Sequence, residues 1–318
     1  MKSLRRAPQS LWVTLTVAAL AGVMSLVSEP FASADNIFNI SRNFAFIGLI
    51  ALGQTAVIAT GGIDLSVGSV MGLVGIVTGL VLASGQPLIV AAAAGLGCAL
   101  LCGLVNGALV AYFRLSPFVV TLGMLSIARS LALVISNNRM IHDFGPDEEL
   151  LLILGGGRFL GVANPVWLLL VAALCAAGWF RYSRLARHVL AVGGNEDSTR
   201  LAGVPVARVK LTVYVLSSLL AGVSAILMVG WLGAVTNALG QNYELRVIAS
   251  AVIGGANLMG GEGGAFGAVA GAALIELIRN SLLLLGVDPY WQGAFIGGSI
   301  IAAMLVERVR RTGRPGVA

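Results

Sequence analysis

The sequence predicts an all-α, polytopic membrane protein with about ten transmembrane helices, some of them broken at glycine-rich motifs. Hydrophobic residues make up 58% of the 318-residue chain and charged residues only 11%, whereas a soluble domain carries about 25% charged residues. Such a chain lacks the polar surface that a soluble globule needs. Its 42 glycines suit close helix packing in lipid, where small residues let backbones approach. We expect a single transmembrane domain over residues 1–318.

The spans follow from the length of a membrane-crossing helix, about 20 apolar residues. The longest uncharged stretch, from Leu65 to Phe113, contains 49 residues and therefore holds two spans, divided by a turn signal at 84–87. The same criterion predicts ten spans, approximately at 11–28, 44–61, 65–84, 88–113, 118–136, 164–180, 211–231, 247–258, 266–285 and 290–306. The sixth is at the short limit, and the eighth is too short to cross alone unless the glycines after it contribute.

The cations predict the orientation, because cytoplasmic segments of membrane proteins are enriched in Lys and Arg. The N-terminal segment, the loop 181–210 and the C-terminal tail are rich in cations, whereas the loop 137–163 holds four acids against two arginines. Ten spans with both termini in the cytoplasm place the cationic segments inside and the acidic, periplasmic loop outside. If 247–258 merely dipped into the membrane, the arginine-rich tail would face outward. We therefore expect a crossing there, formed by a broken helix.

The N-terminus admits a second interpretation. Its three cations (Lys2, Arg5 and Arg6), an apolar stretch and Ala32-Ser33-Ala34 resemble a signal peptide with its cleavage site. The apolar run of about 18 residues exceeds the usual core of roughly 7–15 residues. We therefore favour a retained first helix.

Several kinds of chemistry lack the residues that they need. Cys98, Cys102 and Cys175 lie in apolar runs, where free cysteine acts as a small buried hydrophobe. His142 and His188 lie in separate loops. We therefore expect no metal site, no Cys/His nucleophile pair and no catalytic residues. The net charge of +6 is spread over tails and loops, so we expect no nucleic-acid partner.

The chain also lacks an energy source of its own. Neither of its two lysines, Lys2 and Lys210, ends the G-x-x-x-x-G-K-[ST] loop that binds nucleotide phosphates. Ionisable residues well inside the spans or in a glycine-rich break are few: Asp64, Arg129, Glu262, Glu276 and Arg279. An ion-coupled carrier usually shows a relay of buried acids. Asp64 and Glu276 alone would form only a sparse relay. A self-powered secondary carrier is the alternative, and a membrane-embedded enzyme has no supporting cluster.

The first candidate motif, TGGIDLSVGS at 60–69, lies between the second and third spans. Two glycines, a carboxylate and a serine break a helix here, and irregular backbone at membrane depth is tolerated only beside protein or water. Asp64 sits at the start of the following helix, where the helix dipole and Ser66 stabilise it. Two interpretations stay open: a helix cap without a transport role, or part of a gate or translocation path.

The second motif, GGANLMGG at 254–261, is followed by EGGAFG at 262–267. It echoes the first motif as G-G-x-[DN]-L-x-x-G, with both copies at the cytoplasmic end of a span that runs inward. The matched pairs are Gly61/Gly254, Gly62/Gly255, Asp64/Asn257, Leu65/Leu258 and Gly68/Gly261. Broken helices at matching places in two halves point to a substrate path in transporters. Glycines that serve only close helix packing explain the echo equally well.

The third motif, GGNEDSTRLAGVP at 193–205, predicts a short helix in the loop 181–210. Asn195 caps a first turn that holds two acids, Gly203 is suited to the position after the helix, and Pro205 prevents continuation. A helix of about seven residues lies far below the roughly 12–15 residues at which isolated helices become marginal in water. We expect it to persist only when docked on its own bundle or on a partner. A similar short amphipathic helix is predicted outside, over 146–157.

Together these residues resemble the permease subunits of ribose/xylose/arabinose-type ABC importers. The likeness lies in TGGIDLSVGS (60–69), NGALVAYFRLSPFVVTLGMLSIAR (106–129), GRFLGVANPVW (157–167), AVGGNEDSTRLAGV (191–204) and YELRVIASAVIGGANLMGGEGG (243–264). It covers nearly the whole chain from about 40 to 306. One departure is Pro165, since the family pattern has a proline two residues earlier, and this places only the local loop shape in question.

The resemblance implies a dimer of about ten-helix permeases in the bacterial inner membrane. A cytoplasmic ATPase is expected to dock on the 191–204 loop and to hold the ATP and Mg²⁺, so this chain needs no cofactor. A periplasmic binding protein is expected to deliver a monosaccharide or a related polyol. Which sugar it is, and whether the two permease chains are identical, stay open.

Two groups of candidate site residues follow. The ATPase-coupling residues are Asn195, Glu196, Asp197, Arg200 and Gly203. Sugars are neutral, so the path should offer small polar contacts instead of paired carboxylates. The candidate path or gate residues, chosen on chemistry and position, are Gln54, Thr55, Asp64, Ser66, Asn106 and Asn257.

Overall fold

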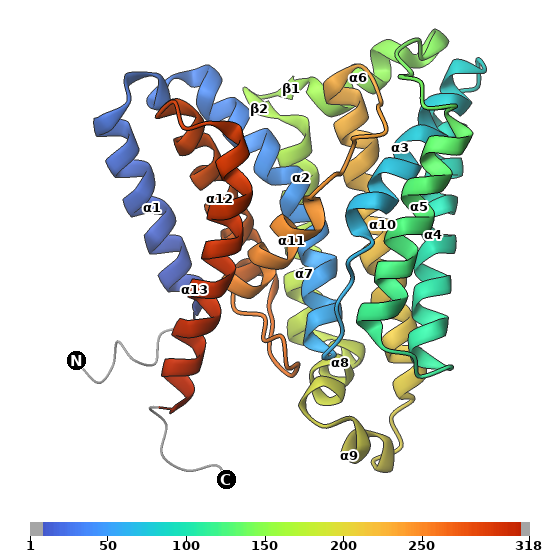
Figure 1. Ribbon diagram of the computed structural model, residues 1–318, viewed down its shortest axis with the longest axis vertical. Coiled ribbons are helices and arrows are strands. Elements are labelled where there is room, and N and C mark those ends of the chain that lie inside the picture. Colours follow the sequence, from blue (N-terminus) through green and yellow to red (C-terminus); the bar gives the residue numbers. More distant parts are fainter. Residues whose placement is uncertain (1–8, 313–318) are drawn as a thin grey trace.

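The computed structural model describes residues 9–312, which are almost entirely helical (Figure 1). The α-helices are α1 (Gln9–Val27), α2 (Ala34–Ala59), α3 (Val67–Ala83), α4 (Leu88–Ala111), α5 (Pro117–Ile135), α6 (Glu148–Gly156), α7 (Asn164–Tyr182), α8 (Arg184–Gly194), α9 (Glu196–Leu201), α10 (Val206–Leu232), α11 (Tyr243–Ile253), α12 (Ala265–Leu284) and α13 (Gln292–Thr312). Short 3₁₀ helices are η2 (Glu29–Ala32), η3 (Gly145–Asp147) and η4 (Pro289–Trp291). Strands β1 (Arg158–Phe159) and β2 (Val162–Ala163) pair antiparallel. The all-α prediction is confirmed.

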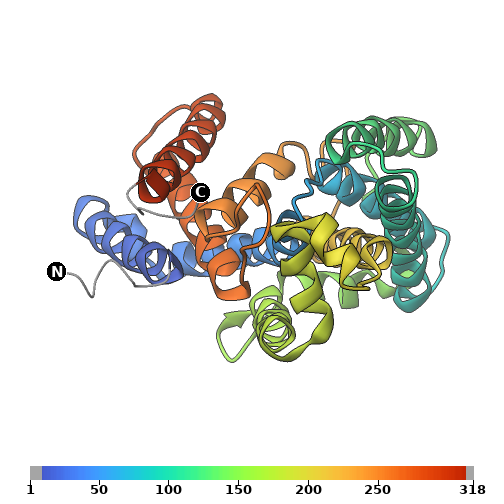
Figure 2. The same cartoon turned by 90° about the horizontal axis from the view of Figure 1, so that it is seen from below.

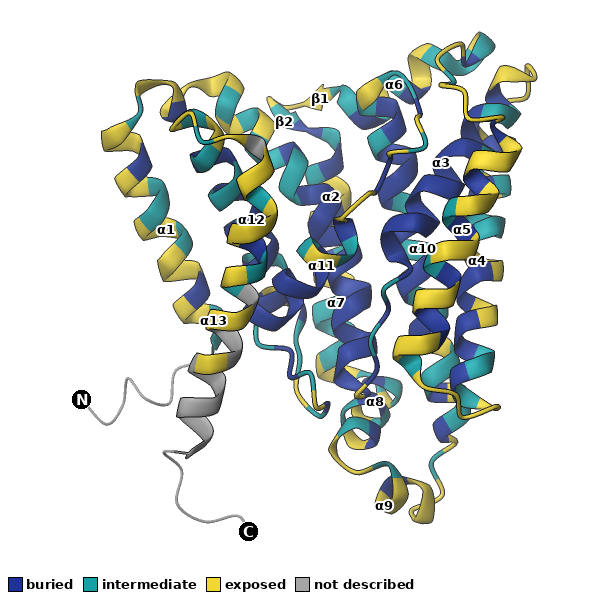
Figure 3. Ribbon diagram, viewed as in Figure 1, coloured by how far each residue is buried: buried dark blue, intermediate teal, exposed yellow. Residues whose placement is uncertain are grey.

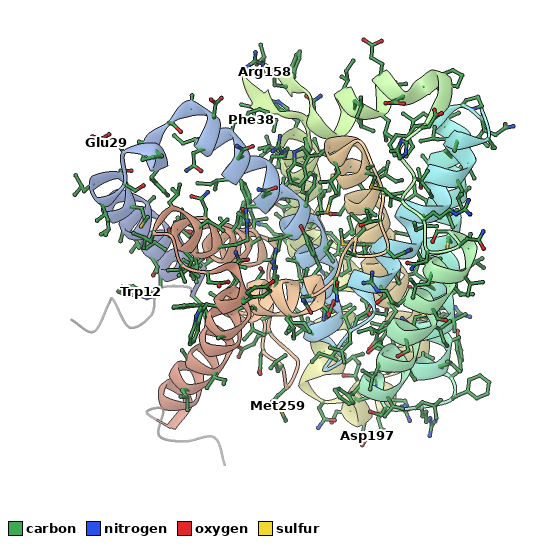
Figure 4. The ribbon with its side chains drawn as sticks, turned by 45° about the horizontal axis from the view of Figure 1, so that its top comes forward. Trp12, Glu29, Phe38, Arg158, Asp197 and Met259 are labelled. Carbon is green, nitrogen blue, oxygen red and sulfur yellow. The ribbon has the colours of Figure 1, made fainter. Side chains whose placement is uncertain are left out.

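The two ends of the bundle carry different loops. The start of α1, the end of α13, and helices α8 and α9 lie at one end, whereas α6 and the β1–β2 hairpin lie at the other (Figure 1). Asp197 and Met259 mark the first end, and Glu29 and Arg158 the second (Figure 4). The first end carries the cationic loop 181–210 and is therefore cytoplasmic by the charge rule. The cations Lys2, Arg5, Arg6 and Arg314 lie outside the described residues.

The core of the bundle is built on α2 and α10. Residues 45–59 of α2 are buried throughout, and the flanking helices cover them (Figure 3). Close approach depends on glycines: an added Cβ on Gly53 of α2 would lie 2.7 Å from the Cα of Ser217 in α10, and one on Gly103 of α4 would lie 2.8 Å from the Cα of Val215. Such contacts hold membrane helices together where no hydrophobic effect drives association.

Seven helices in the described part of the chain are long and apolar enough to cross a membrane: α1, α2, α4, α5, α7, α10 and α12. Each matches a predicted span, with α2 and α10 beginning earlier than expected. The first turns of α2 contain Asn36, Asn39 and Arg42, so a hydropathy criterion cannot detect them. The remaining three predicted spans correspond to α3, α11 and α13.

Two of the crossings are half helix and half extended chain. After α2 ends at the cytoplasmic side, residues 60–66 rise without helical structure, and α3 completes the crossing (Figure 1). After α10 ends at the outer side, residues 233–242 descend in the same irregular manner, and α11 continues inward (Figure 1). α11 has 11 residues, about 16 Å at 1.5 Å per residue, roughly half of the hydrocarbon core. The crossing predicted at 247–258 is therefore a broken crossing. Its helix, α11, lies a few residues earlier in the chain than the predicted span.

These two broken crossings run in opposite directions and touch where their helices begin. A Cβ on Gly68, in the first turn of α3, would collide with the carbonyl oxygen of Gly240, and a Cβ on Gly240 would collide with that of Gly68. The helix N-termini therefore meet inside the bundle. Backbone at this depth must be covered by protein or water.

On the outer side, the predicted short helix over 146–157 is α6, with Pro146 in the preceding turn and Gly157 at its end. It is not a detached surface helix, because Gly155 lies against the backbone of Leu227 and Gly230 in α10. The nearby Pro165 occupies the first turn of α7, a position that tolerates proline because its missing N–H has no partner in the helix.

Candidate functional site

The helix predicted at 193–205 is present as α9, in the form that its sequence indicates. The side chain of Asn195 accepts a hydrogen bond from the backbone N–H of Ser198 at 2.8 Å. Gly203 follows the helix with φ +82°, a backbone conformation that glycine adopts without a Cβ penalty. α9 is thus capped at both ends.

α9 is also tied to its neighbours by side chains. Glu196 accepts hydrogen bonds from Arg200 at 2.6 Å and from Lys210 of α10 at 2.5 Å. The Thr199 hydroxyl donates to the carbonyl of Ala191 in α8 at 2.9 Å. Partial burial opposes ionisation of Glu196, but Lys210 and Arg200 outweigh it, so the pKa of Glu196 is lowered. The helix is therefore fixed to α8 and α10 at neutral pH.

The outward side of α9 is exposed in the part of the chain that the structure describes. Leu201 is 90% exposed, and Arg200 keeps nearly half of its side chain in solvent. Asp197 projects from the cytoplasmic end of the molecule (Figure 4). Leu201, Arg200 and Asp197 thus form an exposed surface on a helix that is held firmly from behind.

The three sequence motifs meet directly above α9. Gly193, near the end of α8, lies so close to Ala59 and Gly261 that an added Cβ would collide with the Ala59 carbonyl oxygen and the Gly261 nitrogen. The N–H of Gly261 donates to the Ala59 carbonyl at 3.0 Å. A Cβ on Gly260 would lie 2.7 Å from the Cα of Gly193. We call this contact of Ala59, Gly193, Gly260 and Gly261 the glycine junction.

The glycine junction joins α8 to both broken crossings. Ala59 is the last residue of α2, directly before the irregular segment 60–66. Gly260 and Gly261 lie in the turn between α11 and α12. The backbone of α8 therefore touches the ends of both crossings without an intervening side chain.

Four of the predicted path residues form one buried network around Asp64. Its Oδ1 accepts from the Ser66 N–H at 2.9 Å and the Ser66 hydroxyl at 2.6 Å, and its Oδ2 accepts from the Ser217 hydroxyl at 3.1 Å. Asn106 of α4 donates to the Ser66 hydroxyl at 2.9 Å. The Gln54 amide, oriented as its neighbours require, pairs with the backbone N–H and carbonyl of Asp64.

This network holds residues 63–66 in place between α2, α4 and α10. The side chains of Gln54, Asp64, Ser66 and Asn106 are fully buried and bind one another or the main chain. The residue directly before α3 is Ser66 and not Asp64. The Asp64 carboxylate instead closes a turn by accepting a hydrogen bond from the backbone N–H of Ser66, two residues later in the chain. A role of these residues in the path stays a prediction.

The other two predicted path residues lie apart from this network. The Thr55 hydroxyl donates to the Ala51 carbonyl at 2.7 Å within α2. Asn257 accepts from the Met259 N–H at 3.0 Å and shapes the turn that carries Gly260. Asn257 therefore belongs with the glycine junction.

Sequence reasoning noted Arg129 as an ionisable residue inside a span but gave it no role, and it missed other polar residues at the meeting point of the broken crossings. Arg129 of α5 donates to the carbonyls of Asn237 at 2.5 Å and Leu239 at 2.9 Å, and so holds the descending segment. Glu244, in the first turn of α11, places its carboxylate against Gly68. Glu244 falls between two predicted spans, so a search for ionisable residues inside spans did not include it. Ser217 gave no signal beyond being polar in an apolar helix.

The second buried acid, Glu276, belongs to a separate cluster. It is 1% exposed and receives two hydrogen bonds from Arg279 one turn later in α12. Among the described residues, none of the hydrogen-bond partners of Asp64 binds Glu276. The same part of the chain contains no group of three His, Cys, Asp or Glu placed to hold a metal ion.

Comparison with known proteins identifies the family. A family model described as "Branched-chain amino acid transport system / permease component" matches residues 36–304. The chain belongs to this permease family. The permease is thus a component of a transport system and not an enzyme, and it is a multi-pass membrane protein.

Curated relatives cover nearly the whole permease. The ribose import permease protein of Escherichia coli (strain K12) is 36% identical over 93% of this chain and 93% of its own length. The L-arabinose ABC transporter permease protein of Azospirillum brasilense is 32% identical over 95% of this chain and 88% of its own, and the fructose import permease protein of Rhizobium meliloti is 33% identical over 96% and 86%. No solved structure matches the permease significantly. The family expected from the sequence motifs is confirmed.

Proposed function

We propose that the permease forms the membrane pathway of an ATP-binding cassette importer that carries a monosaccharide or related polyol across the inner membrane. Its relatives are named for the import of ribose, arabinose and fructose. The observation that carries the proposal is α9: a capped helix of six residues with an exposed leucine, held against α8 and α10. A helix this short is stable only through such contacts, which make it a rigid point for another subunit to move.

The proposed energy source is a separate cytoplasmic ATPase, which binds ATP and Mg²⁺ and docks on α9. The support is the absence of a phosphate-binding loop from the sequence together with the exposed face of α9. Closure of the ATPase displaces α9 and with it α8. The glycine junction transmits this displacement to the cytoplasmic ends of both broken crossings, because backbone there touches backbone.

Two further partners complete the proposed importer. A periplasmic binding protein delivers the sugar to the outer end, where exposed acids such as Glu29, Asp143 and Glu149 offer a surface for a basic partner. A second permease chain, identical or paralogous, supplies the other half of the pathway within the lipid. The inner membrane follows from this arrangement, since the ATPase needs cytoplasmic ATP.

Two other functions make different predictions. The family description names branched-chain amino acids, and a zwitterionic cargo would need a carboxylate-binding and an amine-binding group in the path. A self-powered carrier would need a relay between Asp64 and Glu276, which lie in separate clusters. Uptake of radiolabelled D-ribose, L-arabinose, D-fructose and L-leucine by the assembled transporter separates the two cargo classes. Uptake by the purified chain alone in liposomes under an ion gradient would establish the carrier.

The docking role of α9 has a direct test in the intact complex. Glu196→Ala, Arg200→Ala and Gly203→Val should each reduce the stimulation of ATPase activity by sugar-loaded binding protein. Thr14→Ala, on the exposed side of α1 and away from both α9 and the outer acids, is the control for handling and expression. Normal stimulation in all three α9 variants, with normal amounts of complex, would contradict the docking role.

A further inference from the structure

One surface of the bundle carries a group of polar side chains at a depth where lipid would make them costly, beside exposed apolar residues of α5 such as Leu122, Ile127 and Leu131. We call Ser126, Arg129, Ser130, Gln241, Asn242 and Glu244 the polar face. Ser126, Ser130, Gln241 and Asn242 are exposed, and Arg129 and Glu244 are half-buried. They belong to α5 and to the junction of the segment 233–242 with α11, which begins well inside the bundle (Figure 1).

Other faces of the same molecule are apolar, as contact with lipid requires. Every exposed residue of α4 is apolar: Ile89, Val90, Ala93, Leu100, Leu101, Leu104 and Val105. α7 exposes a similar row, including Leu170, Val171 and Leu174. In the view from below, α5 and α13 lie toward one side of the molecule, α7 and α8 lie toward the other, and α11 lies between them (Figure 2). The bundle therefore presents chemically different sides.

Ionisable and amide side chains at membrane depth face the interior of an assembly or a water-filled path. Arg129 uses one nitrogen for two carbonyl bonds to the segment 233–242, and its remaining donors have no partner among the described residues. Glu244 likewise has no side-chain hydrogen bond there, although its carboxylate lies beside Gly68. Gln241 and Asn242 add amides that both donate and accept. This set provides hydrogen-bonding groups for a neutral polyhydroxyl compound. Its guanidinium and carboxylate also meet the requirement of a zwitterionic cargo, so the uptake comparison described above decides between the two.

We propose that the polar face, and not the buried network around Asp64, lines the route of the sugar through the permease. Glu244, Gln241 and Asn242 contact sugar hydroxyls, and Arg129 positions them by holding the segment 233–242. The identity of the cargo as a sugar rests on the proposed function, whereas exposure of this face to water does not. The position is mechanically significant, because α3 and α11 begin here and the glycine junction acts on both crossings.

Water exposure is tested in membrane vesicles that contain the assembled transporter, with Cys98, Cys102 and Cys175 first replaced by alanine. Single cysteines are then introduced as Ser126→Cys, Gln241→Cys and Asn242→Cys, with Leu101→Cys and Val105→Cys on α4 as matched controls. The probe is membrane-impermeant sulfonatoethyl methanethiosulfonate, which reacts with the thiolate that forms where water is present. Labelling at the first three positions and only background at the α4 positions is expected. Equal labelling of both sets, or none at the first three while the exposed control Met259→Cys is labelled, would overturn the proposal.

Sugar contact has a separate readout. Glu244→Gln should change the KM for D-ribose, L-arabinose and D-fructose unequally, because the three sugars present different hydroxyls to the altered acceptor. If the three KM values are unchanged while the cysteines are labelled as expected, Glu244 does not contact the sugar. The labelling would then still show that this face lines a water-filled path. If no sugar is transported by the wild-type complex, the proposed function fails, and the labelling result still decides whether this face lines a path.

Discussion

A single carboxylate organises the break between α2 and α3. Asp64 gathers two hydrogen bonds from Ser66 and one from Ser217, while Gln54 holds its backbone. Both carboxylate oxygens of Asp64 thereby have hydrogen-bond partners, as buried polar groups require, although Oδ1 of Asn106 in the same network has none among the described residues. The network therefore explains why an acid is present in an apolar chain without assigning it a proton-carrying role.

Substitution of Asp64 separates the structural role from an ion-coupled one. In Asp64→Asn the amide oxygen still accepts from Ser66, and the amide nitrogen donates to the Ser217 hydroxyl, so we expect transport to persist and stability to fall by less than about 1.5 kcal/mol. Asp64→Ala leaves buried donors without partners, each costing about 1–3 kcal/mol. Thermal unfolding of the purified complex and sugar uptake measure both effects. Complete loss of uptake in a stably folded Asp64→Asn variant would favour the ion-coupled alternative.

The Glu196 carboxylate makes the docking of α9 dependent on pH in one direction. Its pKa is lowered in the folded protein, since Lys210 and Arg200 outweigh partial burial. The stabilisation is therefore present above the unfolded Glu pKa of about 4.3 and is lost as the pH falls through the lower folded value. The hydrogen-exchange protection factors of residues 196–201, which correct for the intrinsic pH dependence of exchange, should be constant from neutral pH down to about 5 and should then fall. Glu196→Gln should exchange faster at neutral pH and show no such acid transition.

At the scale of elements, local chemistry predicted α9 but not what α9 acts upon. Asn195, Gly203 and Pro205 determine the ends of this helix through contacts within a few residues, which a sequence displays directly. The glycine junction brings together residues 59, 193 and 260–261, and no local signal records such distant contacts. The echo between 61–68 and 254–261 reflected two turns at the same cytoplasmic end. The opposed broken crossings at 60–83 and 233–253 share no sequence pattern that we detected.

Two adjacent glycines test the glycine junction. Gly193→Ala places a methyl group into the backbone of Ala59 and Gly261, and overpacking of this kind costs about 1–3 kcal/mol. Gly194→Ala meets nothing within 4 Å and keeps the same helix. We expect Gly193→Ala to lower both thermal stability and the coupling of ATP hydrolysis to uptake, and Gly194→Ala to change neither. Equal behaviour of the two variants would show that close backbone contact at the junction is unimportant.

At the scale of the whole molecule, hydropathy located the helices that are long and apolar enough to cross, because lipid requires such stretches. The direction of the crossings rests on the distribution of cations and stays a prediction. Hydropathy placed α3 to within two residues but α11 several residues too late in the chain. The irregular half-crossings are stabilised by neighbours such as Arg129, Ser217 and Tyr214 and not by their own composition. The buried network around Asp64 was predicted as a set of polar residues, but its enclosure was not. Exposure depends on which helices pack around a residue.

The topology of the C-terminal part depends on whether the chain crosses the membrane between α10 and α12. If residues 233–264 cross, the turn at Met259, which is 78% exposed, lies in the cytoplasm with Leu201. If they dip into the membrane and return, both Met259 and the end of α13 lie on the outer side of the membrane. That placement contradicts the distribution of cations, which are enriched on the cytoplasmic side. In a permease without its native cysteines, Met259→Cys and Leu201→Cys should be labelled by a membrane-impermeant thiol reagent in inside-out vesicles. The same two variants should not be labelled in intact cells. Leu160→Cys, 78% exposed in the outer hairpin, should show the opposite pattern. Labelling of Met259→Cys from outside the cell would exclude the broken crossing and the inward path built on it.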